Sequence, residues 1–183
     1  MKNFAPAQLF DQSTQPHIVT LIALASISAL AMNIFLPSLP SMAAYYNTTP
    51  SMMSLSVAIY LGASALLQLF SGPISDRIGR RPVILISLIL FIIASLATIW
   101  APNAETFLAL RFVQAFAATA MVLSRAVVRD TVGKEAAASK IAYVTMGMAV
   151  APMIGPGIGG YLDKYFGWQA IFVLLAGLGI CIF

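Results

Sequence analysis

Arg111 is the residue whose chemistry stands out first, because it lies near the start of a long apolar segment at residues 107–128. Gln114 follows one helical turn later and would share its helix face. An arginine inside a membrane span costs several kcal/mol unless it faces a polar cavity or a partner, and no Asp or Glu falls within any apolar segment of the chain. We therefore interpret Arg111 and Gln114 as a functional polar pair. The alternative is an arginine that snorkels to the nearby membrane surface.

Segment 72–82 is the second place where reactive residue types gather, and it reads Gly-Pro-Ile-Ser-Asp-Arg-Ile-Gly-Arg-Arg-Pro. Its glycines would allow a tight turn between two helices, and its aspartate could cap a helix end or pair with an arginine. A basic membrane anchor would explain the arginines, but not an aspartate between two glycines. We predict a functional loop made of Gly72, Asp76, Arg77, Gly79, Arg80 and Arg81.

A third segment, residues 147–160, carries a small residue at every fourth position from Gly147 to Gly159. Such a stripe lets a neighbouring helix approach closely, and the prolines between its members would add bends. We predict a helix that packs tightly and also flexes, with static close packing as the alternative. The residues concerned are Gly147, Ala151, Pro152, Gly155, Pro156, Gly159 and Gly160.

Four further residues are candidates for a substrate cavity: Asn33, Phe35, Met121 and Met146. Asn33 is polar at membrane depth, so it either lines a cavity or hydrogen-bonds a neighbouring helix. Flexible methionine thioethers suit varied apolar ligands, although most methionines here serve ordinary packing. The single histidine and single cysteine argue against a metal site or an internal disulfide. With no catalytic triad, phosphate loop or paired carboxylates, we expect neither enzyme activity nor a cofactor.

The elements that position these residues are membrane spans. Of the 183 residues, 60% are hydrophobic and 9% are charged, against about 25% charged in soluble domains. A spanning helix needs about 20 apolar residues. We therefore expect an all-α membrane protein in which a tail at 1–16 precedes a bundle at 17–183. The predicted spans lie near 18–36, 53–70, 83–101, 107–128 and 142–161, with an incomplete one at 169–183.

The basic residues predict the orientation of the bundle. Segments 72–81 and 125–140 together hold seven Lys and Arg, whereas segments 41–51, 102–106 and 162–168 hold one. The positive-inside rule then places the N-terminal tail and both basic segments in the cytoplasm. The net charge of +4 follows this topology rather than a nucleic-acid patch. The alternative that the first span is a cleaved signal peptide fits poorly, because its n-region is long and carries one lysine.

A weak internal repeat links the two halves of the bundle. Segments 72–79 and 159–167 both read Gly-x3-Asp-[Arg/Lys] with a glycine just beyond, and their aspartates are 87 residues apart. The first copy would lie inside and the second outside. This predicts two three-helix units of inverted topology, which is a common plan of secondary transporters.

These motifs together resemble the major facilitator superfamily. Segment 72–81 is similar to the signature loop between its second and third helices. Arg111 and Gln114 resemble the fourth-helix motif of its proton-coupled members, although Ala115 stands where glycine is common. Segment 147–160 is similar to the fifth-helix antiporter motif of drug exporters. Segment 36–40, Leu-Pro-Ser-Leu-Pro, resembles the end of helix one in the bicyclomycin and chloramphenicol resistance branch.

The resemblance implies the N-terminal half of a twelve-helix transporter of the inner (plasma) membrane that exports small amphipathic, drug-like compounds against inward proton flow. In that family the signature loop latches the outward-facing state, and the fourth-helix arginine takes part in proton coupling. Asn33 stands where the branch usually has an acidic residue. The missing six-helix half would be a partner, and we expect no transport from this chain alone. The alternatives are a metabolite importer and a non-transporting subunit that binds a partner through the small-residue stripe.

Overall fold

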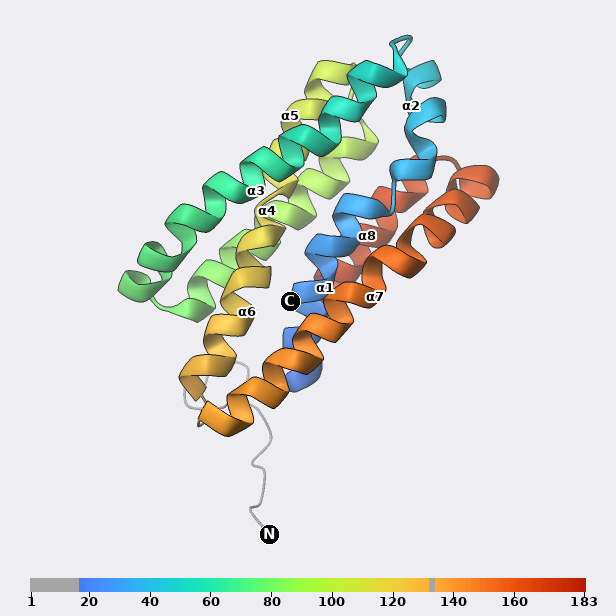
Figure 1. The fold of residues 1–183 in the computed structure, drawn as a ribbon. Helices are drawn as coiled ribbons and strands as arrows, with labels where there is room; N and C mark the ends of the chain where they lie inside the picture. Colours follow the sequence, from blue (N-terminus) through green and yellow to red (C-terminus); the bar gives the residue numbers. More distant parts are fainter. Residues whose placement is uncertain (1–16, 132–133) are drawn as a thin grey trace.

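The computed structural model describes residues 17–131 and 134–183, and the secondary structure in these ranges is entirely helical (Figure 1). This confirms the predicted all-α class. The elements are α1 (Ile18–Asn33), the short 3₁₀ helix η1 (Leu36–Ser38), α2 (Leu39–Tyr45), α3 (Pro50–Ile78), α4 (Arg80–Ile99), α5 (Ala104–Gln114), α6 (Ala117–Thr131), α7 (Lys134–Phe166) and α8 (Gln169–Ile182).

Five of the predicted spans are long enough to cross a membrane. Together α1, η1 and α2 make one span of 28 residues, and α5 with α6 makes another of 27. The remaining three are α3, α4 and α7. Helix α8 has 14 residues and reaches about 21 Å at 1.5 Å per residue, short of the roughly 30 Å of hydrocarbon. The prediction of five full spans and one short span is confirmed.

The second span is longer than predicted, and this moves the turn that follows it. Thr49 caps α3 by accepting a hydrogen bond from the Met52 amide (3.2 Å). At the other end the helix continues past residue 70 to Ile78. Gly72 therefore lies inside α3, and the prediction that it helps to form the turn is wrong. The turn is made by Gly79 alone, whose positive φ of 96° suits glycine.

Other spans also differ from their predicted limits, and the first continues through α2 to Tyr45 instead of ending near residue 36. Helix α7 starts at Lys134 and ends at Phe166, well beyond the predicted 142–161, and it continues unbroken through Pro152 and Pro156. The fourth span is interrupted after Gln114, where the chain passes from α5 to α6. An apolar stretch locates a span but not the ends of its helix, because the helix can continue in polar turns beyond the hydrocarbon core of the membrane.

The internal repeat has a clear structural counterpart. Helix α3 ends at Gly79 (φ 96°) and helix α7 ends at Gly167 (φ 81°). Each glycine amide donates to a carbonyl four residues back, that of Ser75 and that of Asp163. The two ends lie at opposite ends of the bundle in Figure 1. The two three-helix units are thus inverted, as the sequence predicts.

The small-residue stripe packs against helix α1. A Cβ added to Gly147 would overlap the side chain of Ile22, and one added to Gly159 would overlap the backbone carbonyl oxygen of Ile34. Gly155 makes the same kind of contact with Leu30, where an added Cβ would lie 3.1 Å from Cδ1. The stripe is therefore occupied by a helix of the same bundle. This removes the basis for a subunit that binds a foreign partner through it.

We predict that Gly159→Ala destabilises the chain while Gly157→Ala does not. The added methyl at 159 meets the Ile34 carbonyl and forces α1 and α7 apart, which costs about 1–3 kcal/mol. At Gly157 an added Cβ meets nothing within 4 Å, and alanine there favours the helix by about 0.5–1 kcal/mol. Thermal unfolding midpoints in detergent measure both effects. Equal midpoints for the two variants would contradict the close α1–α7 contact.

Candidate functional site

Arg111 is fully buried at the centre of the bundle. Its side chain is 0% exposed, although it lies in the last turn of α5. The snorkelling alternative is therefore wrong: the guanidinium turns inward instead of reaching the membrane surface. A buried cation without compensation costs several kcal/mol, so the surrounding groups must supply its stabilisation.

The backbone of α1 supplies the first part of that compensation. Both terminal nitrogens of Arg111 donate to the Ala31 carbonyl oxygen, Nη1 at 3.2 Å and Nη2 at 3.3 Å. Helix α1 ends at Asn33, and the last four carbonyls of a helix have no partner within it. These carbonyls also carry the negative end of the helix dipole. Arg111 thus occupies the position at a helix C-terminus where a cation is most favourable.

Gln114 supplies the second part. Its Oε1 accepts from Arg111 Nη1 at 2.7 Å, and its Nε2 donates to the Ser95 hydroxyl at 3.1 Å. A longer contact of 3.5 Å reaches the Thr98 hydroxyl. Arg111 and Gln114 therefore form the pair that the sequence predicts, and Gln114 connects the arginine to α4. Ser95 and Thr98 could not be selected from sequence, because hydroxyls are common in this apolar helix.

Two aromatic rings complete the surroundings of Arg111. The guanidinium carbon Cζ lies 4.2 Å from the ring centroid of Phe35 and 4.7 Å from that of Tyr60. Desolvated cation–π contacts of this kind contribute about 2 kcal/mol or more. Phe35 comes from the link between α1 and η1, and Tyr60 comes from α3. In the described ranges no carboxylate forms an ion pair with Arg111.

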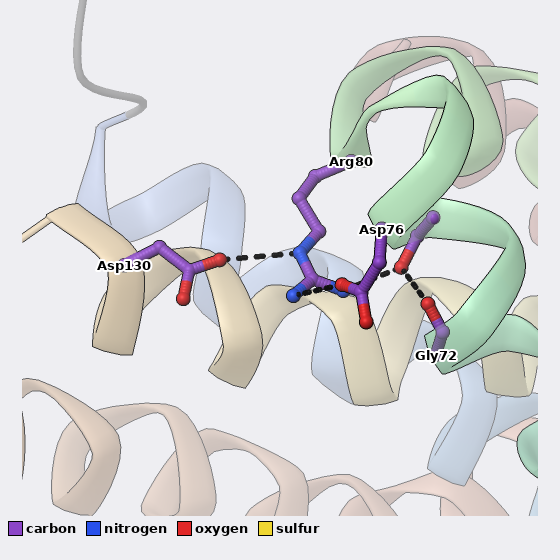
Figure 2. A network of polar contacts seen from close by, with 5 residues as sticks. Gly72, Asp76, Arg80 and Asp130 are labelled. Carbon is purple, nitrogen blue, oxygen red and sulfur yellow. Dashed lines mark hydrogen bonds and ion pairs between the residues drawn. The ribbon is translucent and has the colours of Figure 1, made fainter.

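Figure 2 shows a second polar network at the end of α3, with Arg80 at its centre. Arg80 forms ion pairs with Asp76 (2.7 Å) and with Asp130 at the end of α6 (3.1 Å). It also donates to the Ser75 hydroxyl, which in turn donates to the Gly72 carbonyl at 2.9 Å. Asp76 thus pairs with an arginine and does not cap the helix.

Asp130 is the member of this network that sequence analysis missed. Its position at the end of the fourth span, on the same predicted side as Arg80, was the available signal. Asp76 and Asp130 are 61% and 48% exposed, so each ion pair contributes less than about 1 kcal/mol. The network orders the turn and joins α3, α4 and α6 rather than adding much stability. The side chains of Arg77 and Arg81 are exposed nearby.

The four cavity candidates are not brought together. Phe35 is buried against Arg111. Asn33 is half-buried and donates to the Ala29 carbonyl of its own helix at 2.7 Å, not to a neighbouring helix as one alternative from sequence expected. Met121 is half-buried on α6, whereas Met146 is 58% exposed on α7. An apolar groove between α3 and α4, lined in part by Leu67, Phe70 and Ile74, contains none of them.

The sequence matches a known protein family over most of its length. The model of the Major Facilitator Superfamily matches residues 21–183. The chain belongs to this superfamily. It is therefore a multi-pass membrane protein of a transporter family.

The relatives of this superfamily member point to one branch. The chain is 39% identical to a chloramphenicol resistance protein of Pseudomonas aeruginosa over 158 residues, which cover 84% of the chain and 37% of that protein. It is 33% identical to a bicyclomycin resistance protein homolog of Haemophilus influenzae over 171 residues, or 93% of the chain and 43% of the relative. Multidrug resistance protein D of Escherichia coli is 30% identical over 159 residues, or 86% and 40%.

The chain spans about two fifths of the length of these curated relatives. This share agrees with a six-helix half of a twelve-helix fold. The resemblance to the bicyclomycin and chloramphenicol resistance branch is confirmed by the relatives' names.

Proposed function

We propose that this chain is the N-terminal half of a secondary transporter that exports drug-like compounds in exchange for protons. The names of its relatives, which are chloramphenicol, bicyclomycin and multidrug resistance proteins, support export of such compounds. The substrates are small and amphipathic, and a second six-helix half completes the substrate cavity between two rocking units. Of the four cavity candidates, Asn33, Met121 and Met146 are proposed to contact substrate, whereas Phe35, which is fully buried against Arg111, acts through that arginine.

Proton coupling rests on one observation, the burial of Arg111 without a carboxylate partner in the described ranges. A permanent positive charge at membrane depth favours the ionised form of any acidic group that approaches it, and so releases that group's proton. Arg111 with Gln114 is then the coupling pair. The acidic group reaches Arg111 only when the transporter changes conformation, since no carboxylate in the described ranges forms an ion pair with this arginine.

The turn around Gly79 is the proposed conformational switch. Arg80 holds the end of α3 to the end of α6 through Asp130, while its partner Asp76 remains 61% exposed. An exposed carboxylate at a fixed helix end is suited to engage the second half in one state only. Helix α7, with its glycine stripe on α1 and two internal prolines, is proposed to favour exchange over uptake.

We propose that the protein resides in the inner (plasma) membrane with its N-terminus in the cytoplasm. The end of α3 and the end of α6 meet through Arg80 and Asp130, so the basic segments that flank them lie at one end of the bundle. The start of α1 lies at that same end (Figure 1). The positive-inside rule assigns this end to the cytoplasm.

Efflux of a fluorescent dye from everted membrane vesicles tests the proposal. The chain is fused at Phe183 to the portion of the Pseudomonas aeruginosa relative that follows the matched region, and the 183-residue chain is tested in parallel. We expect dye movement that requires the imposed pH gradient in the fusion alone, and that stops when a protonophore collapses the gradient. Gradient-independent movement would contradict proton exchange. Dye or metabolite accumulation in right-side-out vesicles would favour the importer alternative.

We predict that Asp76→Asn abolishes this gradient-driven flux while substrate binding persists. The amide keeps the size of the side chain but loses the charge that pairs with Arg80 and engages the second half. Binding is measured by quenching of the dye's fluorescence, and flux is measured in the same vesicles. Glu105→Gln, which removes an exposed carboxylate at the start of α5, is the control and should retain flux. Normal flux in Asp76→Asn would refute the latch.

A further inference from the structure

The charge of Arg111 has no carboxylate partner in the described ranges, yet several uncharged neighbours contact the guanidinium. Its three hydrogen bonds go to one backbone carbonyl and one amide oxygen, both uncharged groups. Its Nε is buried without a hydrogen-bond partner. The hydrogen bonds involve only the two terminal nitrogens. The Nε edge and the two faces of the guanidinium therefore depend on other contacts to offset the loss of water.

Two aromatic rings provide those contacts from separate elements. Phe35 is 0% exposed and Tyr60 is 2% exposed, so both rings meet the cation out of contact with water. The electron-rich face of an aromatic ring attracts a cation, and desolvation strengthens this attraction. The positive charge of Arg111 thus faces the electron-rich rings of Phe35 and Tyr60 instead of a carboxylate.

Both rings are themselves fixed by contacts beyond Arg111. The Tyr60 hydroxyl lies 3.1 Å from the Ser28 hydroxyl and 3.2 Å from the Ser28 carbonyl oxygen, so α3 is held to α1. The Phe35 ring packs on Phe172 of α8, with centroids 6.5 Å apart. A movement of α1 against α3 or α8 therefore displaces at least one ring from the guanidinium.

We propose that Phe35 and Tyr60 form an aromatic clamp that replaces a carboxylate counter-ion and positions the Arg111 guanidinium on the Ala31 carbonyl. The two are positioning residues, and the proposal rests on the coupling role given to Arg111 above. A ring face attracts the cation without neutralising it. Arg111 therefore keeps its net positive charge for an acidic group that approaches, which a resident carboxylate would cancel. Tyr60 was not selected from sequence, because a tyrosine in a span is usually a packing residue.

Ring fluorination separates this electrostatic role from packing. Fluorine withdraws electron density from the ring face with little change in size, so it weakens attraction to a cation but not apolar packing. Phe35 is replaced in turn by mono-, di- and trifluorophenylalanine in the 183-residue chain. Phe91 of α4 is the matched control, because it is also 0% exposed and no cation–π contact is found at its ring in the described ranges.

We expect the thermal unfolding midpoint in lipid nanodiscs to fall stepwise with each fluorine at Phe35 and to stay constant at Phe91. Tyr60→Phe, which keeps the ring, should lower the midpoint less than Tyr60→Leu.

In the vesicle assay with the fusion protein, trifluorination at Phe35 should reduce gradient-driven efflux several-fold. Equal behaviour of the Phe35 and Phe91 series, or unchanged efflux after trifluorination, would overturn the proposal. If unsubstituted protein shows no gradient-driven efflux but the stepwise fall is seen, the proposed function fails while charge compensation by the rings stands.

Discussion

The constraint on which this structure depends is the positive charge of Arg111 in the interior of an apolar bundle. Placing that charge out of water costs several kcal/mol, and three neighbouring helices meet around it to offset the cost. The end of α1 contributes a carbonyl, α4 contributes the hydroxyls that hold Gln114, and α3 contributes an aromatic ring. The helices are thus arranged so that their polar groups and aromatic rings surround one guanidinium.

The remaining packing keeps α1 in the place that Arg111 requires. Glycines at 147 and 159 let α7 approach α1 so closely that a methyl group at either would overlap it. At the other side of the bundle, Gly79 allows the reversal from α3 to α4, and Arg80 ties that reversal to α6. The close contact of α1 with α7 and the charged turn at Gly79 therefore hold the helices of this unit together, while many large apolar side chains remain exposed on its outer faces.

Much of the fold and of the site around Arg111 was predictable from sequence, and the exceptions have physical reasons. Apolar runs located every span, and Arg111 with Gln114 was identified because charge inside a span is costly. The predicted ends of the helices were wrong, as at Gly72. An apolar stretch shows which residues lie in the hydrocarbon of the membrane, but the helical hydrogen bonds continue beyond it. The partners Tyr60, Ser95 and Asp130 were missed because only tertiary folding brings them to the arginines, from positions 16 to 51 residues away in the chain.

The most direct test of the account replaces Arg111 with lysine and measures gradient-driven efflux in the fusion protein. Lysine keeps the charge but lacks the planar guanidinium that contacts Ala31, Gln114 and both rings at once. We predict loss of gradient-driven efflux, with Arg129→Lys on the exposed end of α6 retaining it. Wild-type efflux in Arg111→Lys would contradict the account, because charge alone would then suffice and the geometry around the guanidinium would have no functional role.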